Sequence, residues 1–360
     1  MNHDPRLGQI ETRLSVFPVS LSQEYRAAID LLRLKMTPDE LEQWAVCGLA
    51  VAEQGARAWE VALEYFQSSP TIFDNYSATT VLEWGELGNE ISQGSPSVAV
   101  AYLRASASVF GIGSHEIILW GKLGQSFYKG TWKSTSLACK FFEITPELLN
   151  YITYAELERF AGFIGALSSR SNDLAQECLS LGKDAFARLG DAKGLLISLL
   201  TTIVDTSWRD SKGCLEAAKS GLSMLRESER AQFLIMAERL SKSGERGIPK
   251  FLLESSTGFA QLSPHVQQAV FGLAEDLIQL HPPAVLDFVR NSPAILGRIS
   301  DRELSIWFDY GVQLLASNKE GGMAYFRLES ARSQELIDSL SAVVELGRVK
   351  EVIKLYCRAL

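Results

Sequence analysis

Residues 304–340 read LSIWFDYGVQLLASNKEGGMAYFRLESARSQELIDSL, and this stretch decides the fold. It predicts two helices joined by a short polar turn. The first helix carries Trp307 and, four residues later, Gly311, while the second carries the pair Tyr325-Phe326. The same phrase occurs near the start of the chain, in residues 41–76, and weaker copies lie between. A phrase of this length that recurs along a chain is typical of stacked helical repeats.

An aromatic residue marks each copy, at Trp44, Trp84, Trp120 and Phe160 in the first half and at Phe271 and Trp307 near the end. Neighbouring marks are 36 or 40 residues apart, except for a gap of 111 residues before Phe271, which equals three intervals of 37. About eight units of 36–40 residues therefore fit the chain. Between about residues 170 and 260 the signature is lost, although helical apolar periodicity continues.

The positions around each aromatic mark predict how one unit packs. A glycine has no side chain, so the second helix can approach the first closely at that point. The aromatic pair on the second helix then packs back onto the same face. We therefore expect these packing anchors: Trp44, Gly48, Phe66, Trp84, Gly88, Trp120, Gly124, Phe142, Phe288, Trp307, Gly311 and Phe326.

A serine or threonine followed by proline comes after several of the aromatic pairs, at Ser69-Pro70, Thr145-Pro146 and Ser292-Pro293. A residue before proline avoids the helical conformation, and a serine or threonine can cap the helix that follows. These dipeptides therefore predict that the second helix of the unit ends there and that a short third helix begins.

Together these patterns predict an all-α fold without strands, a right-handed α-α superhelix of TPR-like or HEAT-like helical hairpins. We expect a lead-in and first helix in residues 1–36 and the solenoid in residues 37–340, degenerate in 170–260. An amphipathic helix is expected in residues 341–360. The lead-in is expected to be irregular, with a short helix near residues 10–16. The clearest helix start is Thr37, because a capping threonine precedes proline and two acids.

The composition of the chain limits which binding partners and which cellular compartment we expect. Asp and Glu outnumber Lys and Arg by 43 to 35, and no long basic run exists, so nucleic acid is not an expected partner. No apolar stretch is long enough for a membrane span, and the N-terminus lacks the pattern of a signal peptide. The five cysteines are widely separated, which predicts reduced thiols in a cytoplasmic protein rather than a zinc site or disulfides.

Motifs for catalysis or cofactor binding are not found. Phosphate-cradling, zinc-protease and nucleophile-elbow patterns do not occur, and the four histidines are scattered. We therefore expect no catalytic residue, no cofactor and no metal. Basic residues beside the aromatic pairs either line a groove for an acidic partner or form a solvated helix edge: Arg57, Arg104, Lys140, Arg290 and Arg327.

Three phrases carry a family resemblance: LEQWAVCGLAVAEQGARAWEVALEYFQSSP, WGKLGQSFYKGTWKSTSLACKFFEITPELL and the segment from IWFDYG to the C-terminal CRAL. They resemble the helical N-terminal region of bacterial proteins that carry a C-terminal von Willebrand factor A domain and are related to NorD and CbbO. The resemblance covers most of residues 37–360. It implies an adaptor that works with a MoxR-type AAA+ ATPase to activate or remodel a target complex.

The family's A domain binds a divalent metal through a DxSxS motif, which does not occur in this sequence. The metal-dependent part of the family's function is therefore not expected of these residues. The function predicted is a non-enzymatic protein-interaction scaffold. Two alternatives stay open: a TPR-like or HEAT-like scaffold with no ATPase link, and an all-α enzyme with a pocket in residues 170–260. In that region, residues 207–210 are the one polar cluster that includes an aromatic residue.

Overall fold

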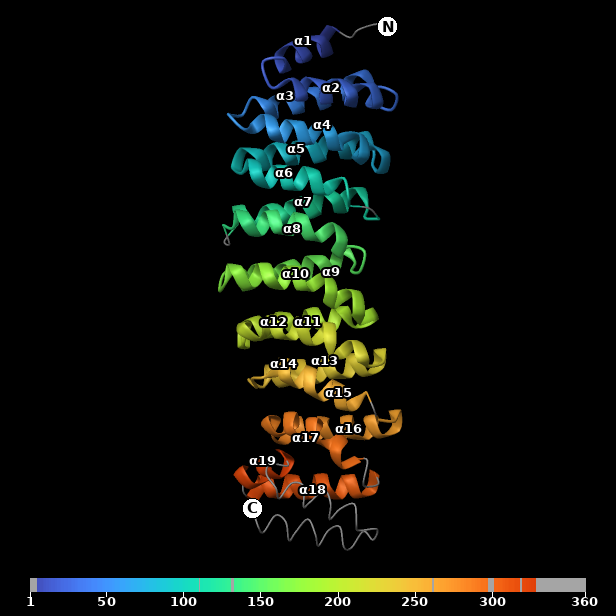
Figure 1. The fold of residues 1–360 in the computed structure, drawn as a ribbon, viewed down its shortest axis with the longest axis vertical. Coiled ribbons are helices and arrows are strands. Elements are labelled where there is room, and N and C mark those ends of the chain that lie inside the picture. Colours follow the sequence, from blue (N-terminus) through green and yellow to red (C-terminus); the bar gives the residue numbers. More distant parts are fainter. Residues whose placement is uncertain are drawn as a thin grey trace. The chain divides into compact units, whose positions relative to one another are not determined.

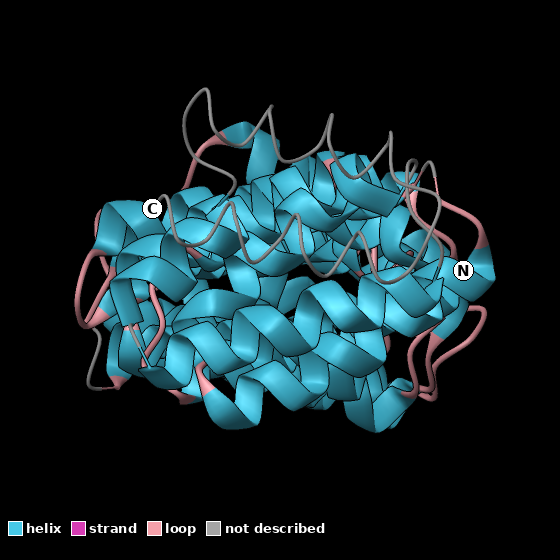
Figure 2. Cartoon of the chain, turned by 90° about the horizontal axis from the view of Figure 1, so that it is seen from below, coloured by secondary structure: helices cyan, strands magenta, loops and turns pink. Residues whose placement is uncertain are grey.

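The structure is a computed structural model that describes residues 5–109, 111–130, 133–260, 262–296, 301–317 and 319–327. Within these ranges the chain forms helices and loops and no strand, which confirms the predicted all-α fold (Figure 2). The chain divides into two compact units, residues 1–183 and 184–360. The right-handed superhelix and the segment limits at residues 36 and 340 stay predictions, and the predicted helix in 341–360 lies outside the described ranges.

Unit 1 is built from helices that alternate between two layers (Figure 1). In one layer α1, α3, α5, α7 and α9 each pack on the next, and in the other layer α2, α4, α6 and α8 do the same. Consecutive helices such as α3 and α4 form hairpins. The bounds are α1 Pro5–Leu14, α2 Val19–Leu32, α3 Pro38–Ala52, α4 Ala58–Asn75, α5 Ala78–Gly94, α6 Pro96–Ser106, α7 Ser114–Lys129, α8 Thr135–Leu148 and α9 Tyr154–Ser168.

Helix α10, Asn172–Leu189, contains the division between the units. Unit 2 repeats the two-layer plan: α11, α13, α16 and α18 form one layer, and α12, the segment from α14 to α15, α17 and α19 form the other. The bounds are η1 Gly190–Ala192, α11 Lys193–Thr206, η2 Trp208–Asp210, α12 Ser211–Ser220, η3 Leu222–Met224, α13 Glu227–Lys242, α14 Ile248–Lys250, η4 Phe251–Ser255, α15 Ser256–Phe259, α16 Pro264–Leu280, α17 Pro282–Leu296, α18 Asp301–Ser317 and α19 Lys319–Arg327.

The degenerate middle of the sequence is helical throughout its apolar segments. Helices α10, α11 and α13 lie where periodicity predicted them, and residues 248–259 form one helical run with a π turn in its centre. The hairpin plan therefore continues where the tryptophan-glycine signature has disappeared. Apolar periodicity alone is enough to maintain it, because stacking requires an apolar face rather than a particular residue.

Capping chemistry fixes the start of α3 as predicted. The Thr37 hydroxyl accepts a hydrogen bond from the Glu40 amide at 3.3 Å, and the Glu40 carboxylate accepts one from the Thr37 amide at 2.8 Å. The hydrogen bonds from Thr37 lower the pKa of Glu40. Thr153 and Glu156 form the same reciprocal pair at the start of α9. The N-terminal helix α1 runs from Pro5 to Leu14, so the expected short helix near residues 10–16 was placed too late.

A continuous row of aromatic rings forms the core of unit 1, stacked from Tyr25 to Trp84 and tilted from Trp84 to Trp120. Tyrosines from the even helices alternate with tryptophans from the odd helices, at ring-centroid distances of 5.4 to 6.3 Å. The row runs Tyr25, Trp44, Tyr65, Trp84, Tyr102 and Trp120. Unit 2 has the same arrangement in Phe288, Trp307 and Tyr325. All of these rings are buried, so the tryptophans are packing residues rather than a ligand-stacking surface.

The glycine after each tryptophan receives the second residue of the aromatic pair. A Cβ atom built on Gly124 would lie 2.1 Å from Cζ of Phe142, and one built on Gly48 would lie 2.3 Å from Cε1 of Phe66. Gly311 faces Phe326 at 2.3 Å in the same way. Gly88 instead faces Leu103 at 2.8 Å. A side chain of the second helix, a phenylalanine ring in three of these four cases, therefore occupies the volume that a Cβ atom would need.

The Ser-Pro and Thr-Pro pairs do not end their helices, which corrects the sequence-based expectation. Helix α4 continues through Pro70 to Asn75, and α8 and α17 continue past Pro146 and Pro293. The Ser69 hydroxyl donates to the Tyr65 carbonyl at 2.5 Å and accepts from the Trp44 indole nitrogen at 2.9 Å. Thr145 makes the equivalent bonds to Phe141 and Trp120. The hydroxyl thus accepts a hydrogen bond from the tryptophan in the core. Packing holds the helix together although proline has no backbone N–H to donate.

We expect Gly124→Ala to lower the free energy of unfolding by about 1–3 kcal/mol, because the new methyl group overlaps the Phe142 ring. The matched control is Gly162→Ala, on helix α9, where an added Cβ meets nothing within 4 Å. That control should be neutral or raise stability by up to about 1 kcal/mol through helix propensity. Urea unfolding followed by circular dichroism measures both. Equal effects of the two substitutions would show that the close approach at Gly124 is not a packing constraint.

Candidate functional site

A solvent-exposed groove of about 470 Å³ lies between α6 and α8 in unit 1. Its lining comes from Ala101, Arg104, Ala105 and Ser108 on and just after α6, and from Cys139, Phe142, Glu143, Pro146 and Glu147 on α8. The floor is mostly apolar and the charged groups stand at the edges. This groove is the strongest candidate for a functional site, since binding sites combine an apolar concavity with a few polar groups.

The groove lies where α6 carries smaller side chains than α8 and ends earlier than α8 does. At the positions where α8 carries Lys140 and Ile144, the register of the aromatic pairs places Ala101 and Ala105 on α6. Helix α6 also ends at Ser106, and no proline follows it. Small side chains and an early helix end leave space beside α8. The missing proline is visible in the sequence, but sequence reasoning did not identify the groove.

The same hairpin is also irregular inside the core. The Trp84 indole nitrogen and the Tyr102 hydroxyl are buried without a hydrogen-bond partner among the described residues. In the hairpin before it, the Tyr65 hydroxyl donates to the Trp44 carbonyl at 3.2 Å, and the Trp44 nitrogen reaches Ser69. Burial raises the pKa of Tyr102 well above its usual value, so this hydroxyl stays neutral. Buried polar groups without partners are rare in folded proteins, and the described residues hold others as well, among them Ser92 of the same hairpin and the indole nitrogen of Trp307 in unit 2.

Ion pairs connect each repeat to the next, at separations of 35 to 40 residues in the sequence. At the groove edge, Arg104 pairs with Glu64 of α4, and this pairing raises the pKa of the arginine. Glu147 pairs with Lys183 of α10. Glu143 is bound at 3.2 Å by Lys140 of its own helix. Each charged group at the groove edge therefore has a partner of opposite charge, with the cation on the α6 side and two carboxylates on the α8 side.

The basic residues singled out in the sequence are mostly matched by carboxylates of the chain. Arg327 donates to Asp287 at 3.0 Å, and Arg290 donates to the same carboxylate at 2.8 Å. Arg57 is exposed at the N-terminal cap of α4. The structure brings Arg104 to the groove, whereas Arg290 and Arg327 form part of the ladder of ion pairs in unit 2. For Arg290 and Arg327 this arrangement favours the solvated helix edge over a groove for an acidic partner.

Residues 207–210 form a structural turn. The Ser207 hydroxyl donates to Asp210 at 2.7 Å, and the Arg209 guanidinium lies 4.7 Å from the Trp208 ring centroid. These residues join α11 to α12 through the short helix η2. Their polar groups are thus used within the turn.

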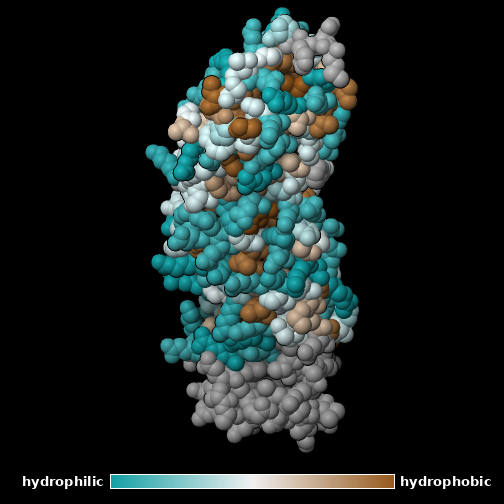
Figure 3. Space-filling view, turned by 45° about the horizontal axis from the view of Figure 1, so that its top comes forward, coloured by the Kyte–Doolittle hydropathy of each residue, from teal (hydrophilic) through white to brown (hydrophobic). Residues whose placement is uncertain are grey.

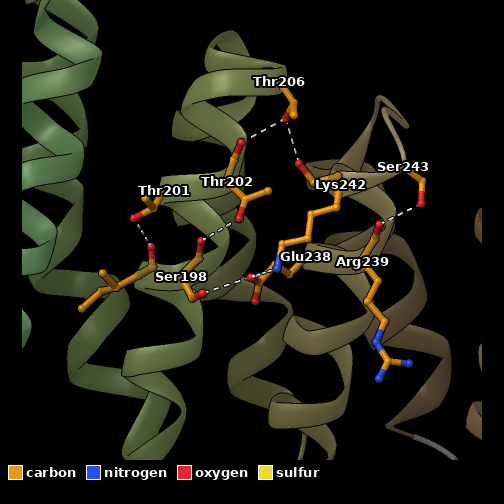
Figure 4. A network of polar contacts seen from close by, with 10 residues as sticks. Ser198, Thr201, Thr202, Thr206, Glu238, Arg239, Lys242 and Ser243 are labelled. Atoms are coloured by element: carbon orange, nitrogen blue, oxygen red, sulfur yellow. Dashed lines mark hydrogen bonds and ion pairs between the residues drawn. The ribbon is translucent and has the colours of Figure 1, made fainter.

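Two polar arrangements in unit 2 were not found from the sequence. Glu238 on α13 accepts hydrogen bonds from Ser198 on α11 at 3.1 Å and from Lys242 at 2.7 Å, and Thr206 contacts Ser241 at 2.9 Å (Figure 4). These contacts join neighbouring helices of one layer. The hydroxyl groups of α11 also donate to their own helix, so the network serves to connect α11 and α13.

Arg230 is the second arrangement. Its guanidinium donates to the backbone carbonyls of Leu222, Leu225 and Ser223 and to that of Arg188, at 2.8 to 3.3 Å. It therefore holds the ends of α10 and α12 together. No local pattern in the sequence marks such a residue, because its acceptors are backbone atoms.

Several large hydrophobic side chains remain exposed in the described part of the chain. They include Val16, Val19, Leu31, Leu34 and Val46 toward the N-terminal end of unit 1. On the face drawn in Figure 3, hydrophobic atoms appear in separate patches among hydrophilic ones. Scattered apolar side chains are ordinary on a protein surface and mark no site.

We expect iodoacetamide at pH 8 to alkylate Cys139 before Cys47 in the folded chain. Burial raises the pKa of Cys47 to about 11, so roughly one thousandth of this thiol is ionised at pH 8. Burial also raises the pKa of Cys139, although Ser97 opposes the shift, and this thiol faces the groove. Peptide mass spectrometry with Cys139→Ser as the control measures the order. Faster alkylation of Cys47 would contradict the assigned environment.

Within the described ranges, no helix is both long and apolar enough to cross a membrane, and no group of three His, Cys, Asp or Glu side chains is placed to hold a metal ion. No family model matches the chain, and neither the curated proteins nor the solved structures contain a significant match to it. The function proposed below therefore depends on the chain's own residues and on the resemblance of its repeat phrases.

Proposed function

We propose that this chain is a non-enzymatic protein-interaction scaffold that holds a partner against the groove between α6 and α8. The observation that carries the proposal is the local departure of one repeat from an otherwise regular plan. In that hairpin two of the residues of α6 that line the groove are alanines, the helix ends early and a groove opens beside α8. Departures from a consistent pattern are expected at functional sites, because the pattern itself serves stability.

The use of aromatic residues supports a binding role. Trp44, Trp84, Trp120 and Trp307 and the aromatic pairs that pack on them are buried, so the regular part of each repeat provides a rigid support. Side chains on the outer surface of the helices can then vary without loss of the fold. Repeat proteins bind partners through such surfaces, since each unit depends mainly on its neighbours for stability.

The resemblance of the repeat phrases adds a partner to the proposal. It supports a bacterial, cytoplasmic adaptor for a MoxR-type AAA+ ATPase, with this chain recognising the target complex and the ATPase supplying the work. A scaffold of the TPR or HEAT kind with no ATPase link is the alternative. The two share the groove and differ in whether an ATPase binds.

The test is binding of the purified full chain to a MoxR-type AAA+ ATPase encoded in the same genome. We expect a complex on size-exclusion chromatography and a dissociation constant of about 1 μM or tighter by calorimetry. An unrelated helical-repeat protein of similar charge serves as the control. Absence of a complex with and without nucleotide would remove the ATPase from the proposal and favour the scaffold without an ATPase link.

A further inference from the structure

We infer that the groove between α6 and α8 binds a peptide segment of a partner protein that carries an apolar side chain, a basic side chain toward α8 and an acidic side chain toward α6. The inference rests on the proposed scaffold function and specifies the chemistry of its partner. Three properties of the groove support it. Its floor is apolar, and its charged edges place a cation on α6 and carboxylates on α8. It also contains a backbone carbonyl of α8 that lacks the usual i+4 donor within the helix.

The apolar floor sets the first requirement. Ala101 and Ala105 on one side and Phe142 and Pro146 on the other leave space that a larger side chain at either alanine would fill. All four are half-buried or buried already, so an entering apolar side chain would remove the remaining exposed apolar surface from water. This burial is the main source of favourable free energy for such an occupant.

The charges at the groove edge set the second requirement. The Arg104 side chain is 69% exposed, and the Glu143 and Glu147 side chains, one helical turn apart, are 66% and 60% exposed. Their present partners form ion pairs at the surface, which contribute little stability because water screens them. A peptide with the opposite order of charge can therefore compete for these groups. Such complementarity selects the orientation of the partner more than it adds affinity.

Backbone chemistry supports a peptide as the occupant. Pro146 has no N–H, so α8 supplies no ordinary i+4 donor to the Phe142 carbonyl, and both residues line the groove. A peptide N–H is the natural donor to a carbonyl of this kind. A small-molecule site would call for polar groups fixed deep in an enclosed cavity, whereas these charged groups stand at the edge of an open groove.

The test uses a displayed library of random peptides selected on the purified full chain. The matched variant is Ala101→Lys with Ala105→Ile, which places on α6 the residues that α8 carries at the same register and so fills the groove with side chains that the fold already accommodates. The control variant is Gln67→Ile, at an exposed position of α4 outside the groove. Circular dichroism verifies that each variant is folded, and fluorescence anisotropy with labelled peptides measures affinity.

We expect the enriched peptides to share an apolar residue flanked by a basic and an acidic one. Their affinity should fall at least tenfold in the groove-filling variant and stay unchanged in Gln67→Ile. Glu143→Lys should shift the selected peptides away from the basic residue. Failure to enrich any peptide, or equal binding to the groove-filling variant, would overturn the inference. Because the ATPase is assayed separately, its binding to the groove-filling variant distinguishes failure of this inference from failure of the proposed function.

Discussion

The stacking of a tyrosine on a tryptophan across each pair of helices is the contact on which the rest of unit 1 depends. It requires the helices to approach until the rings are 5.4 to 5.9 Å apart, and glycines leave room for the second helix, Gly48 for Phe66 and Gly85 for Tyr65. The tryptophan and the glycine therefore act together in the close packing of the two helices. A glycine inside a helix costs about 1 kcal/mol in propensity, and the burial of a ring that it allows outweighs this cost.

A second set of contacts works at the same spacing on the outside of the stack. Lys129 with Glu90 and Arg13 with Glu53 join helices one repeat apart, and the lysine lowers the pKa of Glu90. Each exposed pair is worth little alone. Their common separation nevertheless disfavours a slip of one helix against the next, because a displaced register would bring charges of the wrong sign together. Core rings supply the stability, and surface charges help to fix the alignment.

The fold was predictable because its signals are local and repeated. Trp44 and Gly48 lie one turn apart, and the same interval recurs at Trp120 and Gly124, so periodicity alone indicated stacked hairpins. The continuation of α4 through Pro70 was not predictable from propensity, since it depends on a hydroxyl that meets a tryptophan from another helix.

The candidate site was harder to predict for a related reason. A groove forms where side chains are small. The small size of Ala105 is informative only when it is compared with Ile144 at the same register of the neighbouring helix. An alignment of the repeats against one another carries that signal, whereas a search for catalytic motifs does not. Arg230 escaped detection because its partners are backbone carbonyls, which any sequence provides.

The unpartnered polar groups in the core of the α5–α6 hairpin, which include Trp84 and Tyr102, have a consequence for motion. A stack of repeats opens first at its least stable interface, and a buried donor without an acceptor lowers the free energy needed to open. Trp84 and Tyr102 make the α5–α6 hairpin one such weak point. An occupant that spans α6 and α8 would hold this interface closed. Binding at the surface would then slow amide hydrogen exchange in the core.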